Sequence, residues 1–494
     1  MSESRHLLDR IDQWAVDCPH RLAHTSGSRS LSWLELVEKS NALALWLEEA
    51  LRERSGPVAI RGHKEPEMLV TFLAAVKAGR PYVPMDASIP EQRVAKIVEG
   101  SGAALVLTPE EVGRILAGLS PAAGRKPARR VEGQDPFYIL FTSGSTGEPK
   151  GVVITLANLT AFVDWLCAEH AFSPAAEVFL NQAPFSFDLS VMDLYGSLVT
   201  GGTLASVTKE ELSNLKSLYQ RLESSGVTTW VSTPSFAQMC LIEKGFHAGM
   251  LPRMRRFLFC GETLAPETAA QLLERFGQAQ VWNTYGPTEA TVATTSVRVD
   301  RLLLEKYSPL PVGFPMPGTR VVVVDESGVE VAEGERGEIV IAGPNVSPGY
   351  LQKPDLTAKV FGVWGGQPSY RTGDWGRTKE GLIFFEGRMD GQVKVNGYRI
   401  ELGDLEANLR ALPEIADAVV LPVQKAGKID SLAAFVVLSG PRVGSDFEVS
   451  ARLKTALGER LPAYMLPRKF IFLDAFPMTA NGKADRRQLA ERLG

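Results

Sequence analysis

Apolar and polar positions follow two different periods along the first third of the chain. Short runs of consecutive apolar residues predict buried strands, and longer stretches whose apolar residues recur three or four positions apart predict helices. The predicted elements are a helix over 30–51, a strand over 57–60, a helix over 68–78 and a strand over 103–107. Helices that alternate with buried strands are typical of α/β layers with a parallel sheet.

The first of these helices carries a start signal in its sequence. Ser30 and Ser32 precede its apolar residues, and serine side chains can cap the free N–H groups of a first turn. Glu35 follows Ser32 at capping-box spacing. We therefore expect the helix to begin at these serines.

The pattern divides the chain near residue 390. Residues 118–136 are rich in Pro, Gly, Ala and Arg and are expected to form a surface connection, and 137–141 form an apolar strand. The last hundred or so residues predict a small core of their own, with a strand over 392–395, a helix over 402–412, strands near 418–421 and 433–437, and a helix over 450–461. We expect a large α/β body over 1–386, a hinge over 387–391 and a small mobile α+β lid over 392–494.

Composition narrows the class of protein. A chain of 494 residues is long enough for two to four domains, and its 45% hydrophobic and 22% charged residues are ordinary for a globular cytosolic protein. The formal net charge of −4 and the absence of a strongly basic domain argue against nucleic acid as a partner.

The chain shows no targeting or membrane signal. Glu3 and Asp9 interrupt the N-terminus and no apolar segment follows, so we expect no signal peptide. No stretch of about 18 apolar residues could span a bilayer. The cysteines are far apart and form no CxxC pair, which argues against zinc and thioredoxin-like sites; they are Cys18, Cys167, Cys240 and Cys260. Scattered reduced thiols favour a cytoplasmic location.

A Gly/Ser/Thr loop follows the apolar strand at 137–141. Its glycines let backbone N–H groups converge, its hydroxyls add donors, and a lysine can add charge, which together make an anion site. The residues concerned are Thr142, Ser143, Gly144, Ser145, Thr146, Gly147 and Lys150. The loop is not a Walker A motif, because its lysine is spaced differently and no Ser or Thr follows it. A flexible polar turn is the alternative, and the ten-residue pattern after a buried strand argues against it.

Residues 138–152 resemble the phosphate-loop motif of the adenylate-forming superfamily, which includes acyl-CoA synthetases, luciferases and the adenylation domains of peptide synthetases. The other family motifs recur in order, so the resemblance covers nearly the whole chain. It implies the use of ATP and Mg²⁺.

A second motif resembles the family's adenine and metal motif. It comprises Asn283, Thr284, Tyr285, Gly286, Pro287, Thr288 and Glu289. A tyrosine face can stack on a purine, an amide can read the purine's edge, and a glutamate is a hard oxygen ligand suited to Mg²⁺ on the phosphates. A plain Gly-Pro turn is the alternative, and the complete string makes it insufficient.

Three further motifs of the resemblance lie toward the C-terminus. Residues 370–374 resemble the ribose motif, in which Asp374 accepts hydrogen bonds from both ribose hydroxyls. Gly387 and Arg388 open the segment that resembles the hinge, with Arg388 expected near the nucleotide and Asp390 as the pivot. Lys483 follows an Asn-Gly turn and resembles the lid lysine that reaches the active site during adenylation. Such an ammonium stabilises charge between the substrate carboxylate and the α-phosphate. A solvated surface lysine is the alternative.

The substrate pocket is predicted from family positions. Asp188 matches the carboxylate that holds the α-ammonium of an amino acid; the alternative is a helix N-cap, and it can serve as both. Met192, Cys260, Thr284 and Val292 fall at pocket positions and suggest a small apolar cavity. None of them is charged, so a charged substrate side chain is not expected.

Longer strings resemble the D-alanine–D-alanyl carrier protein ligases. They are 181–195, 232–236 with 239–241, 259–262 and 461–470. The resemblance implies D-alanine as substrate and a role for Cys260 in selecting the D enantiomer; a buried structural cysteine is the alternative. The enantiomers differ by exchange of a methyl and a hydrogen, and one misplaced methyl is worth about 1–3 kcal/mol, so discrimination should be real but incomplete.

The implied acceptor is a separate protein. Only eight residues follow Arg486, so no fused carrier domain is expected. By resemblance, the acceptor is a D-alanyl carrier protein whose phosphopantetheine thiol takes D-alanine for D-alanylation of lipoteichoic acid. The alternatives are a stand-alone adenylation enzyme for L-alanine, serine or proline, an acyl-CoA synthetase, and a non-catalytic relative. Asp188 argues against the second, and Glu289, Asp374 and Lys483 argue against the third.

Overall fold

The computed structural model describes residues 5–120, 125–144, 148–389, 391–395, 398–425, 428–478 and 484–493. The chain forms two compact units, which are described separately. The first unit comprises Met1–Ala87, Ser101–Leu140 and Gly151–Gly387, and the second comprises Ser88–Gly100, Phe141–Lys150 and Arg388–Gly494.

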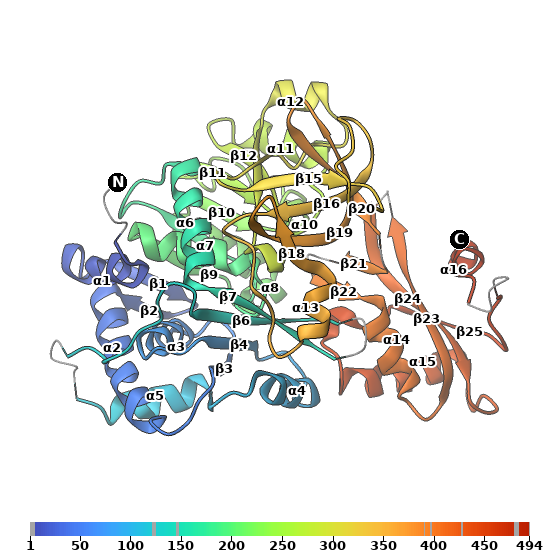
Figure 1. The fold of residues 1–494 in the computed structure, drawn as a ribbon, viewed down its shortest axis with the longest axis horizontal. Coiled ribbons are helices and arrows are strands. Elements are labelled where there is room, and N and C mark those ends of the chain that lie inside the picture. The colour runs from blue at the N-terminus through green and yellow to red at the C-terminus, as the bar shows by residue number, and fades with distance from the viewer. Residues whose placement is uncertain are drawn as a thin grey trace. The chain divides into compact units, whose positions relative to one another are not determined.

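The larger unit contains a nine-stranded sheet (Figure 1). Its strands, in spatial order, are β14 (Phe314–Pro315), β13 (Thr295–Val299), β12 (Gln280–Tyr285), β11 (Arg256–Phe259), β10 (Thr229–Ser232), β8 (Val178–Asn181), β9 (Thr203–Ser206), β1 (Leu22–Ser26) and β2 (Arg29–Ser32). The central strands from β12 to β1 are parallel, and the outer pairs are antiparallel. Parallel strands point their carboxyl ends to one edge of a sheet, where ligands bind in open α/β folds.

A second, six-stranded sheet belongs mainly to the same unit. Its order is β17 (Gly349–Tyr350), β7 (Lys150–Thr155), β6 (Pro136–Thr142), β4 (Tyr82–Asp86), β3 (Val58–Gly62) and β5 (Leu105–Leu107). A further sheet contains β15 (Arg320–Val324), β16 (Gly337–Ala342), β19 (Gln367–Lys379), β18 (Phe361–Trp364) and β20 (Leu382–Arg388). Strands β3, β4, β5 and β6 are parallel, as the alternation of elements predicts.

Helices cover and separate these sheets. They are α1 (Leu7–Asp17), α2 (Trp33–Ala50), α3 (Pro66–Lys77), α5 (Pro109–Ala117), α6 (Leu156–His170), α7 (Leu189–Thr200), α8 (Lys209–Ser213), α9 (Leu215–Ser225), α10 (Pro234–Cys240), α11 (Pro266–Arg275), α12 (Arg301–Lys306), α13 (Pro354–Val360) and the 3₁₀ turn η1 (Thr288–Ala290). Every residue of α7 and every residue of α3 except Glu67 is buried, as expected for helices with apolar surface on nearly all sides.

Helix α7 lies between the two large sheets. It packs on β8, β9 and β10 of the nine-stranded sheet. On its other side, the Tyr195 hydroxyl lies 2.8 Å from the hydroxyl of Tyr82 on β4, and the Tyr195 ring packs edge-on against Phe137 on β6. The helix that begins directly after Asp188 is therefore held rigidly by both sheets.

The smaller unit contains a hairpin and a three-stranded sheet. Its elements are α4 (Glu91–Ser101), β21 (Gln392–Val395), β22 (Tyr398–Glu401), α14 (Leu402–Arg410), β23 (Ile415–Lys425), β24 (Lys428–Leu438), α15 (Asp446–Gly458), η2 (Ala463–Met465), β25 (Lys469–Phe472), α16 (Arg486–Ala490) and η3 (Glu491–Leu493). Helices α14 and α15 cover one face of β23–β24–β25 and share a core with it (Figure 1). A buried ion pair, Arg93 to Asp404 at 3.1 Å, attaches α4 to α14.

The fold class is confirmed, and most predicted elements are too. Helix α2 begins after Ser32, whose capping box with Glu35 is formed in both directions, and β21 has the predicted bounds. The predicted start of the helix at 450 is wrong: α15 begins at Asp446, because Ser445 and Glu448 form a capping box one turn earlier.

Two predicted absences concern membranes and disulfides. Among the described helices, none is long and apolar enough to cross a bilayer. The four cysteines all lie in the described ranges, and none of them forms a disulfide.

Candidate active site

Several predicted site residues of the larger unit lie at the carboxyl ends of parallel strands. Asp188 follows the loop after β8, Cys260 follows the last residue of β11, and Asn283, Thr284 and Tyr285 end β12. Register pairs β11 with β12 from Arg256 and Gln280 onward, so the two strand ends lie side by side. Ligands of open α/β sheets bind at this edge, and the sequence places its candidates there.

The adenine and ribose motifs touch each other through a hydrogen bond. The Tyr285 hydroxyl donates to Asp374 Oδ2 at 2.5 Å, and both side chains are buried. Asp374 is positioned on β19 by its own backbone, whose N–H donates to the Thr372 hydroxyl at 3.0 Å. The ring of Tyr285 lies 5.9 Å from that of Phe385. The structure therefore brings together two motifs that are 89 residues apart in sequence.

Asp188 stands at the N-cap position of α7 without capping the helix. Among the described residues, its side chain makes no cap hydrogen bond; instead Oδ2 accepts from the Thr288 hydroxyl at 2.5 Å. Asp188 is half-buried, so it can be reached by a small ligand. The geometry separates the two sequence alternatives, because the carboxylate faces the second motif instead of the helix start.

Three predicted pocket residues form a tightly packed wall. Cys260 and Val292 are 3% and 2% exposed, and the Cys260 thiol lies 3.6 Å from the Val292 carbonyl oxygen. Met192 is fully buried in the same core cluster. The Thr284 hydroxyl donates to the Phe259 carbonyl at 2.8 Å, which joins the ends of β11 and β12. The close packing of these side chains is consistent with the small apolar pocket that the sequence predicts.

The turn after Tyr285 brings backbone segments into close contact. A side chain on Gly286 would place its Cβ 2.6 Å from the Ala293 Cα, so only glycine fits there. Thr291 and Val292 have φ values of +55° and +71°, an uncommon conformation for residues that carry a Cβ. Pro287 precedes η1 and Thr288 begins it. Such strain clusters at functional sites.

Glu289 is the predicted metal ligand, and it is fully buried. Its Oε1 accepts a hydrogen bond from the Tyr350 hydroxyl at 2.8 Å, which orients the carboxylate. The described residues contain no cluster of three or more His, Cys, Asp or Glu side chains that could hold a metal. Mg²⁺ is commonly held by one or two carboxylates together with substrate phosphates, so a single oriented glutamate fits Mg²⁺ that arrives with a nucleotide.

Asn283 has part of its amide committed to the fold. Its Nδ2 donates to the Pro311 carbonyl at 2.8 Å, and the residue is 3% exposed. The predicted reading of adenine is therefore left to the amide oxygen and the other N–H.

The phosphate-loop residues belong to the smaller unit. Among the described residues, the buried Thr142 hydroxyl has no hydrogen-bond partner, so it is available to a phosphate oxygen. The Ser143 hydroxyl donates to the Arg399 carbonyl at 3.0 Å and accepts from the Glu401 N–H at 3.2 Å. At Gly144, a Cβ would lie 2.3 Å from the Glu148 carbonyl oxygen, which explains the glycine. Lys150 begins β7.

The remaining predicted residues lie at the end of β20 or outside the described residues. Gly387 and Arg388 are the last residues of β20, and Gly387 has a φ of +103°, which a glycine adopts readily. Five predicted residues lie outside the described residues; they are Ser145, Thr146, Gly147, Asp390 and Lys483.

Sequence reasoning missed two residues that support the site. Tyr350, which orients Glu289, is a lone tyrosine 61 residues away from it. Asn345 donates to the Ala290 carbonyl at 2.8 Å and to the Thr294 hydroxyl at 2.9 Å, and so holds the strained turn. The sequence around each residue contains no pattern that predicts its hydrogen-bond partner.

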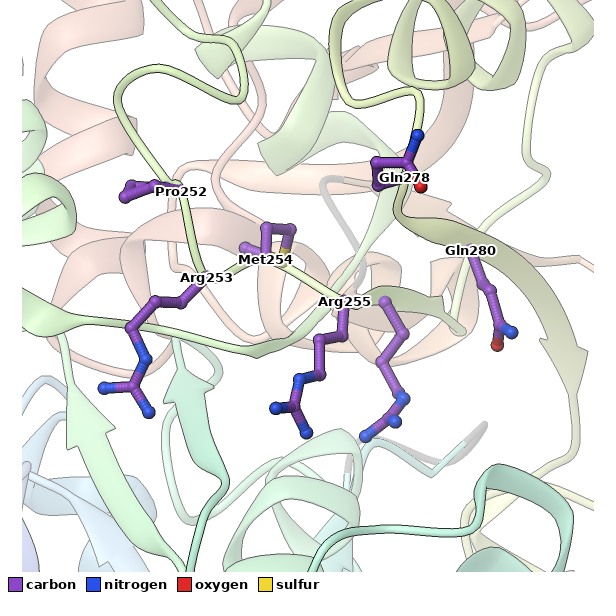
Figure 2. Close-up of a pocket in the computed structure, with 7 residues that line it drawn as sticks. Pro252, Arg253, Met254, Arg255, Gln278 and Gln280 are labelled. Carbon is purple, nitrogen blue, oxygen red and sulfur yellow. The ribbon is translucent and has the colours of Figure 1, made fainter.

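A polar cavity of about 530 Å³ lies at the opposite ends of β11 and β12 (Figure 2). Arg256 and Gln280, the first residues of the two strands, line it together with Arg253 and Arg255. Glu177 neutralises part of this charge, because its carboxylate lies 3.2 Å from Arg256 and 3.4 Å from Arg255. None of the predicted site residues lines this cavity, so it is separate from the candidate active site.

The chain resembles known proteins over nearly its whole length. The family models for the AMP-binding enzyme and for the AMP-binding enzyme C-terminal domain match residues 11–351 and 404–483. The D-alanine–D-alanyl carrier protein ligases of Bacillus mycoides (strain KBAB4) and Bacillus cereus (strain Q1) are 46% and 45% identical to this chain, and each alignment covers 98% of both proteins. The Vibrio cholerae adenylation domain AlmE, solved in complex with glycyl-adenosine-5'-phosphate, has the same fold, with a TM-score of 0.83 at 21% identity over 100% of this chain and 98% of that one. The chain therefore belongs to the AMP-binding, adenylate-forming enzymes and, within them, to the family of D-alanine–D-alanyl carrier protein ligases.

Proposed function

We propose that this chain activates D-alanine with ATP and transfers it to a carrier protein. In the first half-reaction, the carboxylate of D-alanine attacks the α-phosphorus of ATP, and D-alanyl-AMP and pyrophosphate form. In the second, the phosphopantetheine thiol of a D-alanyl carrier protein attacks the acyl carbon and releases AMP. The observation that carries the proposal is the near full-length identity to proteins named for this activity.

The contacts of Asp188 support an amino-acid substrate. An ammonium group that enters a largely apolar pocket needs a counter-charge, and the half-buried Asp188 carboxylate supplies one. Thr288 fixes one of its oxygens and so orients it. We assign the α-ammonium of D-alanine to this carboxylate, and the substrate methyl to the wall formed by Met192, Cys260 and Val292.

The nucleoside part of ATP fits the Tyr285 and Asp374 pair. We assign the adenine to the segment Asn283–Tyr285 and the ribose hydroxyls to Asp374, whose carboxylate Tyr285 holds in place. Thr284, Gly286, Pro287 and Thr288 complete this nucleotide segment. The distance between the reacting carboxylate and the α-phosphate is then set by side chains on a rigid sheet edge, which lowers the entropic part of the barrier.

The phosphate charge is managed by several groups together. Bound Mg²⁺ would neutralise phosphate charge beside Glu289. We assign the loop from Thr142 to Gly147, with Lys150, to the phosphates, and Arg388 to the nucleotide. Lys483 would stabilise the charge that develops between carboxylate and phosphate. No general base is needed, because the substrate carboxylate is already the nucleophile.

The second half-reaction requires a change of orientation. We propose that Gly387 to Gly391, with Asp390 as pivot, form the hinge between the body (1–386) and the lid (392–494). The acceptor is a separate carrier protein in the cytoplasm, where ATP is available, and the product serves D-alanylation of lipoteichoic acid. The names of the relatives support a D-alanyl carrier protein as the acceptor.

The experiment is amino-acid-dependent exchange of pyrophosphate into ATP. D-alanine, L-alanine, glycine, D-serine, L-serine and L-proline are compared at equal concentration, with Lys483→Ala as the catalytically impaired control. We expect D-alanine to dominate and Lys483→Ala to lose about 10²–10³ in rate. Dominance of an L-amino acid would overturn the substrate assignment. If none of the tested amino acids supports exchange, the adenylation chemistry is overturned.

Transfer is measured separately with a purified phosphopantetheinylated carrier protein. We expect D-alanine to appear on the carrier as a hydroxylamine-sensitive thioester. Transfer to coenzyme A in its place would favour an acyl-CoA synthetase.

A further inference from the structure

Lys64 is a completely buried cation beside the segment that carries Asp188. It is 1% exposed and lies between β3 and α3. Its ammonium donates to the Asn181 side-chain oxygen at 2.5 Å and to the Ala183 carbonyl, and it lies 4.5 Å from the centre of the Phe185 ring. Asn181 is the last residue of β8, and Ala183 and Phe185 lie in the segment that connects β8 to α7, before Asp188.

The same network reaches the other side of Asp188. The Asn181 amide donates to Asp193 Oδ1 at 2.9 Å, and Asp193 lies on α7, is fully buried, and keeps its other oxygen without a hydrogen-bond partner among the described residues. Ser206 donates to the same Asn181 oxygen that Lys64 contacts. The two flanks of Asp188 are thus joined through Lys64 and Asn181.

The buried amino group of Lys64 is compensated by its hydrogen-bond acceptors and by a nearby carboxylate. A buried ammonium is unfavourable unless hydrogen bonds and an opposite charge compensate it. Burial lowers the pKa of Lys64 to about 7, and the carboxylate of Asp193 works against that shift. The ammonium also satisfies the inward-facing Ala183 carbonyl, which an apolar side chain could not do.

We infer that Lys64 is a positioning residue for the substrate's ammonium site, because it holds the flank before Asp188 directly and the flank after it through Asn181. The inference rests on the proposed role of Asp188. Lys64 does not touch the substrate in this assignment; it determines where the Asp188 carboxylate stands. A displacement of about 1 Å at such a site can reduce the rate about 10²-fold.

The test variant is Lys64→Met, which keeps an unbranched side chain of similar length and removes the amino group. We expect the KM for D-alanine in pyrophosphate exchange to rise about 10- to 100-fold, while the KM for ATP changes less than about twofold. A KM for D-alanine equal to that of the wild type in the folded variant would overturn the inference.

A matched control separates positioning from general loss of stability. Lys77 is also buried at 5% exposure, pairs with Asp12 at 2.7 Å and donates to Ser40 and Asn41, all away from the segment that carries Asp188. We expect Lys77→Met to lower the melting temperature and to leave the KM for D-alanine unchanged. An equal rise of that KM in both variants would assign Lys64 a structural role only.

A double variant covers the case in which Lys64→Met does not fold. Lys64→Met with Asp193→Asn removes both buried charges, so the fold is relieved of an unpaired carboxylate. We expect its melting temperature to recover while the KM for D-alanine stays raised. Recovery of both quantities would contradict the inference. Asp188→Asn serves as the reference: an unchanged KM there would overturn the proposed role of Asp188, whereas a raised KM there with an unchanged KM in the Lys64 variants would overturn only the positioning role.

Discussion

The hydroxyl of Thr288 donates a hydrogen bond to the carboxylate of Asp188, with 2.5 Å between Oγ1 and Oδ2. This contact joins the proposed nucleotide motif, which includes η1, to the Asp188 carboxylate, which we assign to the substrate ammonium. The two residues are 100 positions apart in sequence. Under the proposed function, the contact gives the two substrates of the first half-reaction a shared structural support. The position of the ammonium site should therefore depend on the nucleotide motif.

Replacement of Thr288 by valine tests this support. The variant keeps the shape of the side chain and removes the donor, and a hydrogen bond to a charged group contributes about 1.5–3 kcal/mol. We expect the KM for D-alanine to rise about 10-fold or more in pyrophosphate exchange. Thr288→Ser keeps the hydroxyl and should stay close to the wild type. Equal KM values in Thr288→Val and Thr288→Ser would contradict the supporting role.

The Tyr285 hydroxyl should matter for ATP and not for the amino acid. Tyr285→Phe keeps the ring but removes the hydrogen bond that holds Asp374. We expect the KM for ATP to rise about 10-fold or more, as the loss of one buried hydrogen bond to a carboxylate implies, with the KM for D-alanine at saturating ATP unchanged. Tyr307→Phe is the matched control, because its hydroxyl donates to Glu380, 73 residues away, outside the candidate site. A larger effect in the control would refute the assignment.

The sequence predicts those parts of the site whose defining residues lie close together along the chain. The motifs from Asn283 to Glu289 and at Asp374 are local strings, and the structure brings Tyr285 and Asp374 together. The start of α2 is equally local, because Ser32 and Glu35 lie within one turn. The capping box of Ser445 and Glu448 is local too, so the start of α15 is also predictable from the sequence.

The supporting residues could not be predicted, because their partners are distant in sequence. Lys64 stands between His63 and Glu65, a polar context that is typical of an exposed lysine. Its hydrogen-bond acceptors, on Asn181 and Ala183, are 117 and 119 residues away. Asn345 and Tyr350 act over 55 and 61 residues. Pairings of this kind are created by the packing of the sheets and have no period or spacing that a single sequence reveals.

Cys260 should contribute to the choice between enantiomers. Its thiol lies against the Val292 carbonyl in the wall assigned to the substrate methyl, and truncation to alanine would open space there. One methyl is worth about 1–3 kcal/mol, so we expect the ratio of kcat/KM for D- over L-alanine to fall about 10-fold in Cys260→Ala. Cys240→Ala removes an equally buried thiol from α10 in a different core cluster and should lower stability without changing the ratio. If both variants keep the wild-type ratio, Cys260 is a packing residue only.

His170 should make the protein less stable in acid. It is 5% exposed, packs edge-on against Trp282, and, among the described residues, neither ring nitrogen has a hydrogen-bond partner. Burial, aided by the charge of Arg256, lowers the pKa of His170 from 6.5 to about 3. Below pH 6.5 the unfolded chain therefore binds a proton that the folded chain does not, and the free energy of unfolding falls until the pH approaches 3. His170→Phe removes this proton uptake, so the wild type should lose about 2 kcal/mol relative to the variant between pH 7.5 and pH 5 in urea unfolding, since each pH unit below 6.5 is worth about 1.4 kcal/mol. A difference between the two proteins that is the same at both pH values would show that His170 is charged in the folded state or exposed to solvent.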